Sequence, residues 1–132
     1  MHRHRPPIAD RTPKPLPAEL DKAHGFLWWC DQSALVFGSD RRQPTATRMT
    51  LSLIRGWQRS AVLPATTQAN PAFYRLDPAR FLTHGQERRE SWLCPRYETV
   101  DNDWLLHKAG LVDQTTRVSI VHWLRELAGE PS

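Results

Sequence analysis

An arginine and two threonines lie at the two ends of a predicted β-hairpin, where they could bind a phosphate group. Arg48 begins the stretch RMTLSLIR, and Thr66 and Thr67 end the stretch QRSAVLPATT. Arginine presents a planar fork of donors to phosphate oxygens and stays charged, and a threonine hydroxyl can donate to a second oxygen. From spacing alone two interpretations remain open: Arg48 and Thr66 form a phosphate clamp, or they are solvated strand ends, which is the commoner case.

The hairpin itself is predicted from the pattern of side chains. Apolar and polar residues alternate along residues 48–55, which indicates a half-buried strand. Gly56 predicts a turn, and residues 58–67 form the second strand. Pro64 cannot donate to a sheet ladder, so we expect it at a sheet edge or a strand end.

Further short elements are predicted on both sides of the hairpin. The aromatic run 24–31 favours a strand, 37–48 a loop, 73–78 a short strand, and 89–101 one or two strands. Residues 102–110 fit either a short helix that ends at Gly110 or a strand.

A helix is predicted at the C-terminal end. Its apolar stripe has the spacing i, i+3, i+4 and i+7 and consists of Ile120, Trp123, Leu124 and Leu127. Thr115 or Thr116 could cap its start, and Gly129 its end. Several short strands followed by this helix indicate an α+β protein that is mainly β, a small barrel or sheet with α additions.

Length and charge suggest one domain with a basic tail. The chain has 132 residues and a formal charge of +4. Residues 1–18 carry five prolines and a net charge of +3, so we predict a disordered tail there and a single domain over 19–132. The tail could add affinity for nucleic acid, or it could serve solubility alone. We see no apolar signal-peptide core and no membrane span, and we expect a cytoplasmic protein.

Other kinds of site are not indicated. Cys30 and Cys94 lack a CxxC partner and are expected to be two buried thiols. Phosphate-binding glycine loops, GxSxG and HExxH motifs and carboxylate clusters are absent, so we expect no metal and no cofactor. His24 and His84 each precede a glycine, and a catalytic role for either is the less favoured interpretation.

Four stretches, taken in order, resemble the MazF/PemK family of toxins from bacterial toxin–antitoxin systems. They are GFLWWCD at 25–31, GSD at 38–40 followed by Arg48, VLPATTQ at 62–68, and GQERRESWLCPRYETVD at 85–101. The resemblance covers roughly residues 24–128. The chain departs from the family where Met49 replaces the proline after the arginine, and where Pro95, Arg96 and Glu98 occupy the late D-Q-x-[KR] positions.

The resemblance implies an SH3-like β-barrel with a C-terminal helix, usually a homodimer. It implies a metal-independent endoribonuclease that cuts single-stranded RNA and is restrained by a cognate antitoxin. By motif position, the catalytic arginine and threonine fall on Arg48 and Thr66, and the loop acid falls on Asp40.

The implied reaction uses the 2′-OH of RNA as nucleophile and leaves a 2′,3′-cyclic phosphate and a 5′-OH. Arg48 would balance charge on the phosphoryl oxygens, Thr66 would hold one of those oxygens, and Asp40 would accept the 2′-OH proton. The remaining candidate substrate-binding residues are basic, polar or aromatic: Thr67, Gln68, Arg41, Arg42, Arg55, Trp57, Arg59 and Arg96.

Two other functional classes remain open. One is a non-catalytic module of the same fold that binds RNA or protein. The other is a gyrase poison of the CcdB type, which shares this barrel and acts on a protein.

Overall fold

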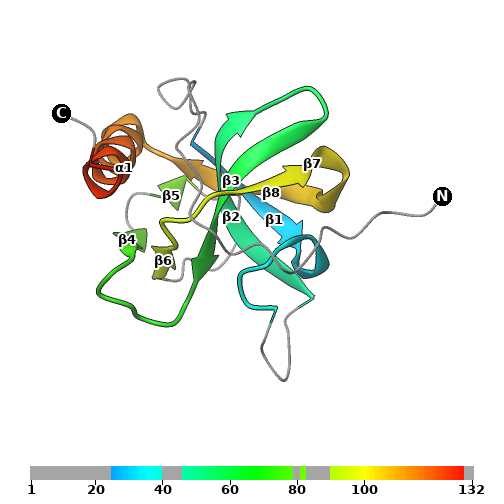
Figure 1. Ribbon diagram of the computed structural model, residues 1–132, viewed down its shortest axis with the longest axis horizontal. Coiled ribbons are helices and arrows are strands. Elements are labelled where there is room, and N and C mark those ends of the chain that lie inside the picture. Colours follow the sequence, from blue (N-terminus) through cyan, green and yellow to red (C-terminus); the bar gives the residue numbers. More distant parts are fainter. Residues whose placement is uncertain (1–24, 40–45, 79–80, 83–89, 130–132) are drawn as a thin grey trace.

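The computed structural model describes residues 25–39, 46–78, 81–82 and 90–129, with only the backbone described for 81–82. Within these residues, eight strands form one antiparallel sheet in the order β4-β6-β3-β2-β1-β8-β5, and β7 pairs with β3. In Figure 1 both ends of this sheet, β4 and β5, lie on the same side of the view as α1, the single α-helix among the described residues. The fold is α+β and mainly β, as the sequence predicted.

The elements are bounded as follows. The strands are β1 Phe26–Asp31, β2 Thr47–Arg55, β3 Arg59–Thr66, β4 Tyr74–Leu76, β5 Phe81–Leu82, β6 Ser91–Leu93, β7 Glu98–Asp101 and β8 Leu105–Val112. The helices are the short 3₁₀ turns η2 Gln32–Ala34 and η4 Asn102–Trp104 and the α-helix α1 Gln114–Leu127. The predicted basic tail, 1–18, lies outside the described residues.

The predicted hairpin is present as β2 and β3. Thr50 pairs with Pro64, and Arg55 pairs with Ser60 at the other end, with one irregularity in the register between them. The strands predicted over 24–31, 73–78 and 89–101 are also confirmed, the last of these as the two strands β6 and β7. β5 was not predicted, because two residues are too short to show a period.

Pro64 does not lie at an edge or a strand end, so that prediction was wrong. It is buried inside β3, which has neighbours on both sides. On one of these sides β3 pairs with β7 as far as Val62 and with β6 from Ala65 onward. Pro64 lies where one neighbour replaces the other, so its missing N–H breaks no continuous ladder. Its carbonyl still accepts the Cys94 N–H at 2.9 Å.

Residues 102–110, which the sequence left ambiguous, contain both predicted kinds of structure. A 3₁₀ turn over Asn102–Trp104 leads directly into β8. Gly110 ends no helix; it lies within β8 opposite Leu27. The turn separates β7, which pairs with β3, from β8, which pairs with β1.

Helix α1 begins at a different cap from the one predicted. The side chain of Asp113, not that of Thr115 or Thr116, accepts the Thr116 N–H at 2.7 Å. Aspartate is as good an N-cap as threonine and also favours the positive end of the helix dipole. Gly129 follows the helix with a φ of +74°, as predicted for its end.

The apolar residues form two clusters, one on each face of the central strands. The larger cluster includes Leu27, Leu51, Leu63 and the helix residues Ile120 and Leu124. The predicted apolar stripe of the helix is therefore confirmed at Ile120 and Leu124, whereas Leu127 is 57% exposed.

The second cluster contains Cys30, Val62, Val100, Trp104 and Leu105. Cys30 and Cys94 are buried free thiols, as predicted. None of the described helices is long and apolar enough to cross a membrane.

Candidate functional site

Arg48 is buried at the start of β2, with only 6% of its surface exposed. Its Nε donates to Oε1 of Gln32 at 2.6 Å, and Nη1 donates to the carbonyl oxygen of Ala65 at 2.9 Å. Ala65 directly precedes Thr66 in β3. The structure therefore brings the arginine to the end of the hairpin that carries the threonine, as the hairpin prediction required.

Gln32 is positioned by the turn that follows β1. The side chain of Asp31 accepts the Ser33 N–H at 2.9 Å and so caps the 3₁₀ turn η2. The Gln32 N–H donates to the Ala46 carbonyl at 3.1 Å, which ties this turn to the residue before β2. Gln32 is buried, and its amide faces both Arg48 and the chain at Phe37, to whose carbonyl it donates at 2.6 Å.

The segment after η2 covers the guanidinium group of Arg48. The Arg48 Cζ atom lies 4.9 Å from the ring centre of Phe37, in cation–π contact. Gly38 has a φ of +79°, and a Cβ atom on it would lie 2.6 Å from Nη2 of Arg48. Glycine is required here twice over, by the backbone conformation and by the close approach of the arginine.

A carboxylate from β7 holds this covering segment in place. Glu98 Oε1 accepts the Val36 N–H at 2.7 Å, and Oε2 accepts the Phe37 N–H at 3.0 Å. Hydrogen bonds to an ionised carboxylate are stronger than neutral ones. The chain from Glu98 through Phe37 and Gln32 to Arg48 therefore links β7, η2 and β2 in one polar network.

Thr66 lies at the end of β3 and is 7% exposed. Its hydroxyl oxygen accepts the backbone N–H of Gln68 at 3.1 Å, which forms a tight turn after the strand. Thr67 and Gln68 in this turn are exposed. The hydrogen bond from Arg48 to Ala65 brings the arginine to the strand end that Thr66 occupies, and the turn with Thr67 and Gln68 follows directly. The catalytic roles of these residues stay predictions.

The other candidates divide between the two ends of the hairpin. Arg96 is exposed in the turn between β6 and β7, which lies beside the Thr66 end because the Cys94 N–H bonds to Pro64. Asp40, Arg41 and Arg42 lie outside the described residues.

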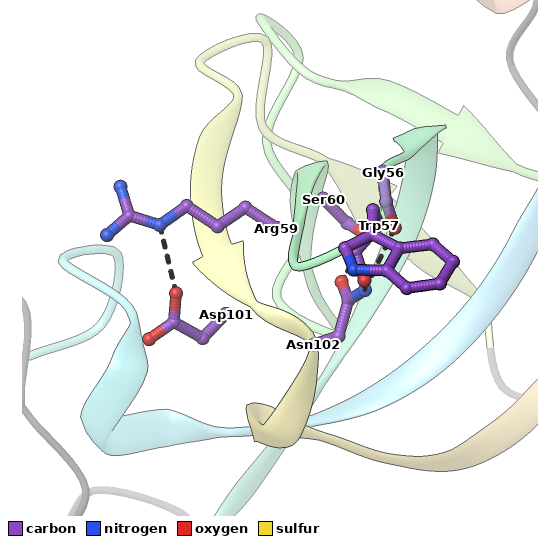
Figure 2. Close-up of polar contacts among 6 residues, drawn as sticks. All are labelled: Gly56, Trp57, Arg59, Ser60, Asp101 and Asn102. Atoms are coloured by element: carbon purple, nitrogen blue, oxygen red, sulfur yellow. Dashed lines mark hydrogen bonds and ion pairs between the residues drawn. The ribbon is translucent and has the colours of Figure 1, made fainter.

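The structure places Arg55, Trp57 and Arg59 at the far end of the hairpin. Seven positions of β2 separate Arg48 from Arg55, a distance of about 20 Å for an extended strand. Arg59 is exposed and forms an ion pair with Asp101 at 3.0 Å. Figure 2 shows this ion pair and the indole of Trp57 pointing to opposite sides of the turn. These three residues therefore do not surround the same phosphate as Arg48.

The titratable group nearest the network with a clear shift is Cys30. Burial, with smaller contributions from the carboxylates of Asp31 and Glu98, raises the pKa of the Cys30 thiol to about 12. A thiol with such a pKa stays protonated at neutral pH and is a poor nucleophile. In the described part of the chain, no three His, Cys, Asp or Glu side chains gather to hold a metal ion.

Sequence reasoning missed three residues of the network: Gln32, Phe37 and Glu98. Gln32 and Phe37 show no motif, because a glutamine after a strand and a phenylalanine before a glycine are ordinary. Glu98 was noted only as a departure from a family pattern. Its contact with residues 36 and 37 spans more than 60 positions of sequence, a pairing that neither periodicity nor local spacing can reveal.

The fold is similar to those of two solved mycobacterial endoribonucleases. One was solved in complex with its cognate antitoxin; it aligns with a TM-score of 0.58 and 18% identity over 83% of this chain and 95% of that chain. The other aligns with a TM-score of 0.54 and 17% identity over 83% and 93%. No family model and no curated protein matches the sequence. At these identities the likeness establishes a shared fold.

Proposed function

We propose that this chain is a toxin-like, metal-independent endoribonuclease of the MazF/PemK type. It would cut single-stranded RNA and leave a 2′,3′-cyclic phosphate and a 5′-OH. The observation that carries the proposal is the hydrogen bond from Arg48 to the Ala65 carbonyl, which holds a buried cation next to Thr66. Two endoribonuclease structures with a similar fold support it.

The burial of Arg48 supports a role in charge stabilisation. A guanidinium group that Gln32 holds and Phe37 covers is already oriented before a phosphoryl oxygen becomes more negative, and only the bond from Nη1 to the Ala65 carbonyl must be exchanged. An oxygen that replaced the Ala65 carbonyl would receive the same N–H. Thr66, one residue away, would then bind a second oxygen of the same phosphate.

The remaining roles are activation of the nucleophile and binding of the RNA. We assign proton removal from the 2′-OH to Asp40, because arginine does not readily deprotonate. The 2′-oxygen bonds to phosphorus as the P–O5′ bond breaks, and the leaving 5′-oxygen takes up a proton from water. Thr67 and Gln68 would orient the RNA, and the basic residues Arg41, Arg42 and Arg96 would contact its phosphates. Neither a metal nor a cofactor enters this scheme.

The wider family properties belong to the same proposal. We propose an SH3-like barrel over the domain 19–132, a homodimer, and regulation by a cognate antitoxin in the cytoplasm. The neighbour solved with its cognate antitoxin supports the antitoxin as a partner.

The test is cleavage of single-stranded RNA in the presence of EDTA by protein freed of any antitoxin. The expected products carry a cyclic phosphate, which acid hydrolysis opens and phosphatase treatment alone does not remove. Intact RNA after long incubation would reject the proposal. Arg48→Ala and Thr66→Ala should each remove most of the cleavage.

Matched variants separate chemistry from folding. Thr66→Ser keeps a hydroxyl and should retain far more activity than Thr66→Ala. Thr99→Ala removes an exposed threonine of β7 and should behave like the wild type. Thr66→Ala cutting at the wild-type rate would refute the site assignment.

One observation favours a second candidate, a module of the same fold that binds RNA without cutting it. The Nε and Nη1 donors of Arg48 are both directed to protein acceptors. If these bonds persist when RNA binds, the arginine supports the fold alone. Wild-type protein that binds RNA and leaves its length unchanged would select this candidate.

A further inference from the structure

A row of alternating cationic and aromatic side chains crosses three neighbouring strands, β2, β1 and β8. The guanidinium Cζ of Arg55 lies 4.4 Å from the ring centre of Trp28. The Nζ atom of Lys108 lies 4.5 Å from the ring centre of Phe26 and 5.8 Å from that of Trp28. Both cations are exposed and both aromatic rings are half-buried. We call Arg55, Trp28, Lys108 and Phe26 the cation–aromatic row.

The row lies on the same face of the sheet as Arg48. Residues paired directly across antiparallel strands point to one face, and so do alternate residues along a strand. Trp28 pairs with Lys108, and Cys30, two positions further along β1, pairs with Arg48. Arg48 and the row therefore share a face. Trp28 and its partner Lys108 lie two positions along β1 from the Cys30–Arg48 pair, whereas the backbone of Arg55 lies seven positions along β2.

The turn next to the row presents a second aromatic surface. Trp57 is 94% exposed, which is exceptional for a tryptophan. The side chain of Asn102 donates to the carbonyls of Gly56 at 2.9 Å and Trp57 at 3.1 Å, and it accepts from Ser60 Oγ at 2.6 Å (Figure 2). The backbone that carries Trp57 is thus fastened to η4, and the exposed ring is not the result of a loose loop.

These groups have the chemistry that binds single-stranded nucleic acid. Such sites combine cations that follow the phosphates with flat groups on which bases stack. An arginine that lies over an indole presents its outer plane for stacking, and Lys108 supplies a compact charge for phosphate. An acidic peptide would use the same cations but would leave the exposed planar surface of Trp57 without a matching group.

We propose that the cation–aromatic row, together with Trp57, binds a segment of single-stranded RNA outside the reaction centre. This inference rests on the proposed function, because it makes the row a second contact for the RNA held at Arg48. RNA that contacts both must extend beyond the phosphate held at Arg48, by at least about 7 Å along the face of the sheet. A dinucleotide has a single phosphate and, once that phosphate is held at Arg48, no further phosphate for the row.

The test compares a dinucleotide, the short RNA, with a long oligonucleotide of about 16 nucleotides, the upper end of such binding sites. Arg55→Gln combined with Lys108→Gln should raise KM for the long RNA about tenfold and leave kcat and the short RNA unchanged. The slope of log K against log salt for the long RNA should fall by about 1.4 for the two lost phosphate contacts. Arg55→Lys keeps the positive charge but loses the planar guanidinium group. Its KM for the long RNA should lie between those of the wild type and the double variant.

The control is Arg75→Gln, which removes an exposed arginine of β4 that forms an ion pair with Glu90. It should leave both KM values unchanged, and thermal melts should show every variant folded. Equal effects on long and short RNA, or an equal effect of Arg75→Gln, would overturn the inference. Binding of a polyglutamate peptide through Arg55 and Lys108, in the absence of any binding of the long RNA there, would also overturn the inference.

The two proposals can fail separately. Fluorescence anisotropy with labelled long and short RNA measures binding without cleavage. If the wild type cleaves nothing, but the double variant binds the long RNA more weakly than the wild type does, the proposed function fails and the row stands. If the wild type cleaves RNA and the double variant binds and cleaves the long RNA normally, the row fails and the proposed function stands.

Discussion

Arg48 donates its Nε hydrogen to Oε1 of Gln32 at 2.6 Å, and both side chains are buried. The amide of Gln32 also donates to the carbonyl of Phe37, whose ring lies against the same guanidinium group. One side chain therefore sets both the arginine and the segment that covers it. Gln32 is a positioning residue for Arg48 in the proposed reaction.

Replacing Gln32 should misplace Arg48 without removing it. In Gln32→Ala a buried charged donor loses its acceptor, so the free energy of unfolding should fall by about 1–3 kcal/mol. The kcat for RNA cleavage should fall at least about tenfold, while KM changes less. Gln32→Glu keeps an acceptor for Arg48 but cannot donate to Phe37. Its kcat should lie between those of the wild type and Gln32→Ala. An unchanged kcat in Gln32→Ala would show that Arg48 is positioned by other contacts.

Two glycines with similar backbones give a matched pair for the contact with Arg48. Gly38 and Gly129 have φ values of +79° and +74°, but an added Cβ meets Nη2 of Arg48 at Gly38 and no atom within 4 Å at Gly129. Both alanine variants should lose about 1–2 kcal/mol from the left-handed backbone. Only Gly38→Ala should also displace Arg48 and reduce cleavage. Chemical denaturation measures the loss of stability, and an RNA cleavage assay measures the loss of activity. Equal cleavage by the two variants would contradict this geometry.

The buried thiol Cys30 should make the protein less stable at alkaline pH. Its pKa is raised from 9.0 to about 12 in the folded state, so between these values the folded state binds more protons than the unfolded state. Stability is then fully present below pH 9 and is lost as the pH rises toward 12, by about 1 kcal/mol per pH unit.

Urea denaturation from pH 8 to 10.5 measures this loss. Cys30→Ala should flatten the dependence, and Cys94→Ala should flatten it as well, because burial raises the pKa of the Cys94 thiol too. An unchanged slope in both variants would rule out the thiols as its source.

Asn102 should control the turn that presents Trp57. In Asn102→Ala the carbonyls of Gly56 and Trp57 and the hydroxyl of Ser60 lose a shared partner. We expect a loss of about 1–3 kcal/mol and faster hydrogen exchange in the turn, measured by mass spectrometry. Cleavage of the short RNA should not change, because the turn lies about 20 Å from Arg48. Loss of that cleavage would mean that the two ends of the hairpin are coupled.

Local patterns in the sequence were sufficient to predict the hairpin and the helix. The alternation along residues 48–55 and the stripe that contains Ile120 and Leu124 both reflect burial of one face, which is a local property of strands and helices. The proximity of Arg48 to Thr66 followed from the hairpin alone. The cap at Asp113 was missed because three neighbouring residues could each serve as the N-cap.

The tertiary structure alone decided the partners of Arg48 and the division of the candidate residues. Glu98 reaches residues 36 and 37 only because β7 pairs with β3, and Pro64 is tolerated only because β3 changes neighbours there. The sequence grouped Arg55, Trp57 and Arg59 with Arg48, whereas the extended strand carries them to the opposite end. Residue type and period are local information, but burial of a charge and the distance between two sites depend on which distant segments pair.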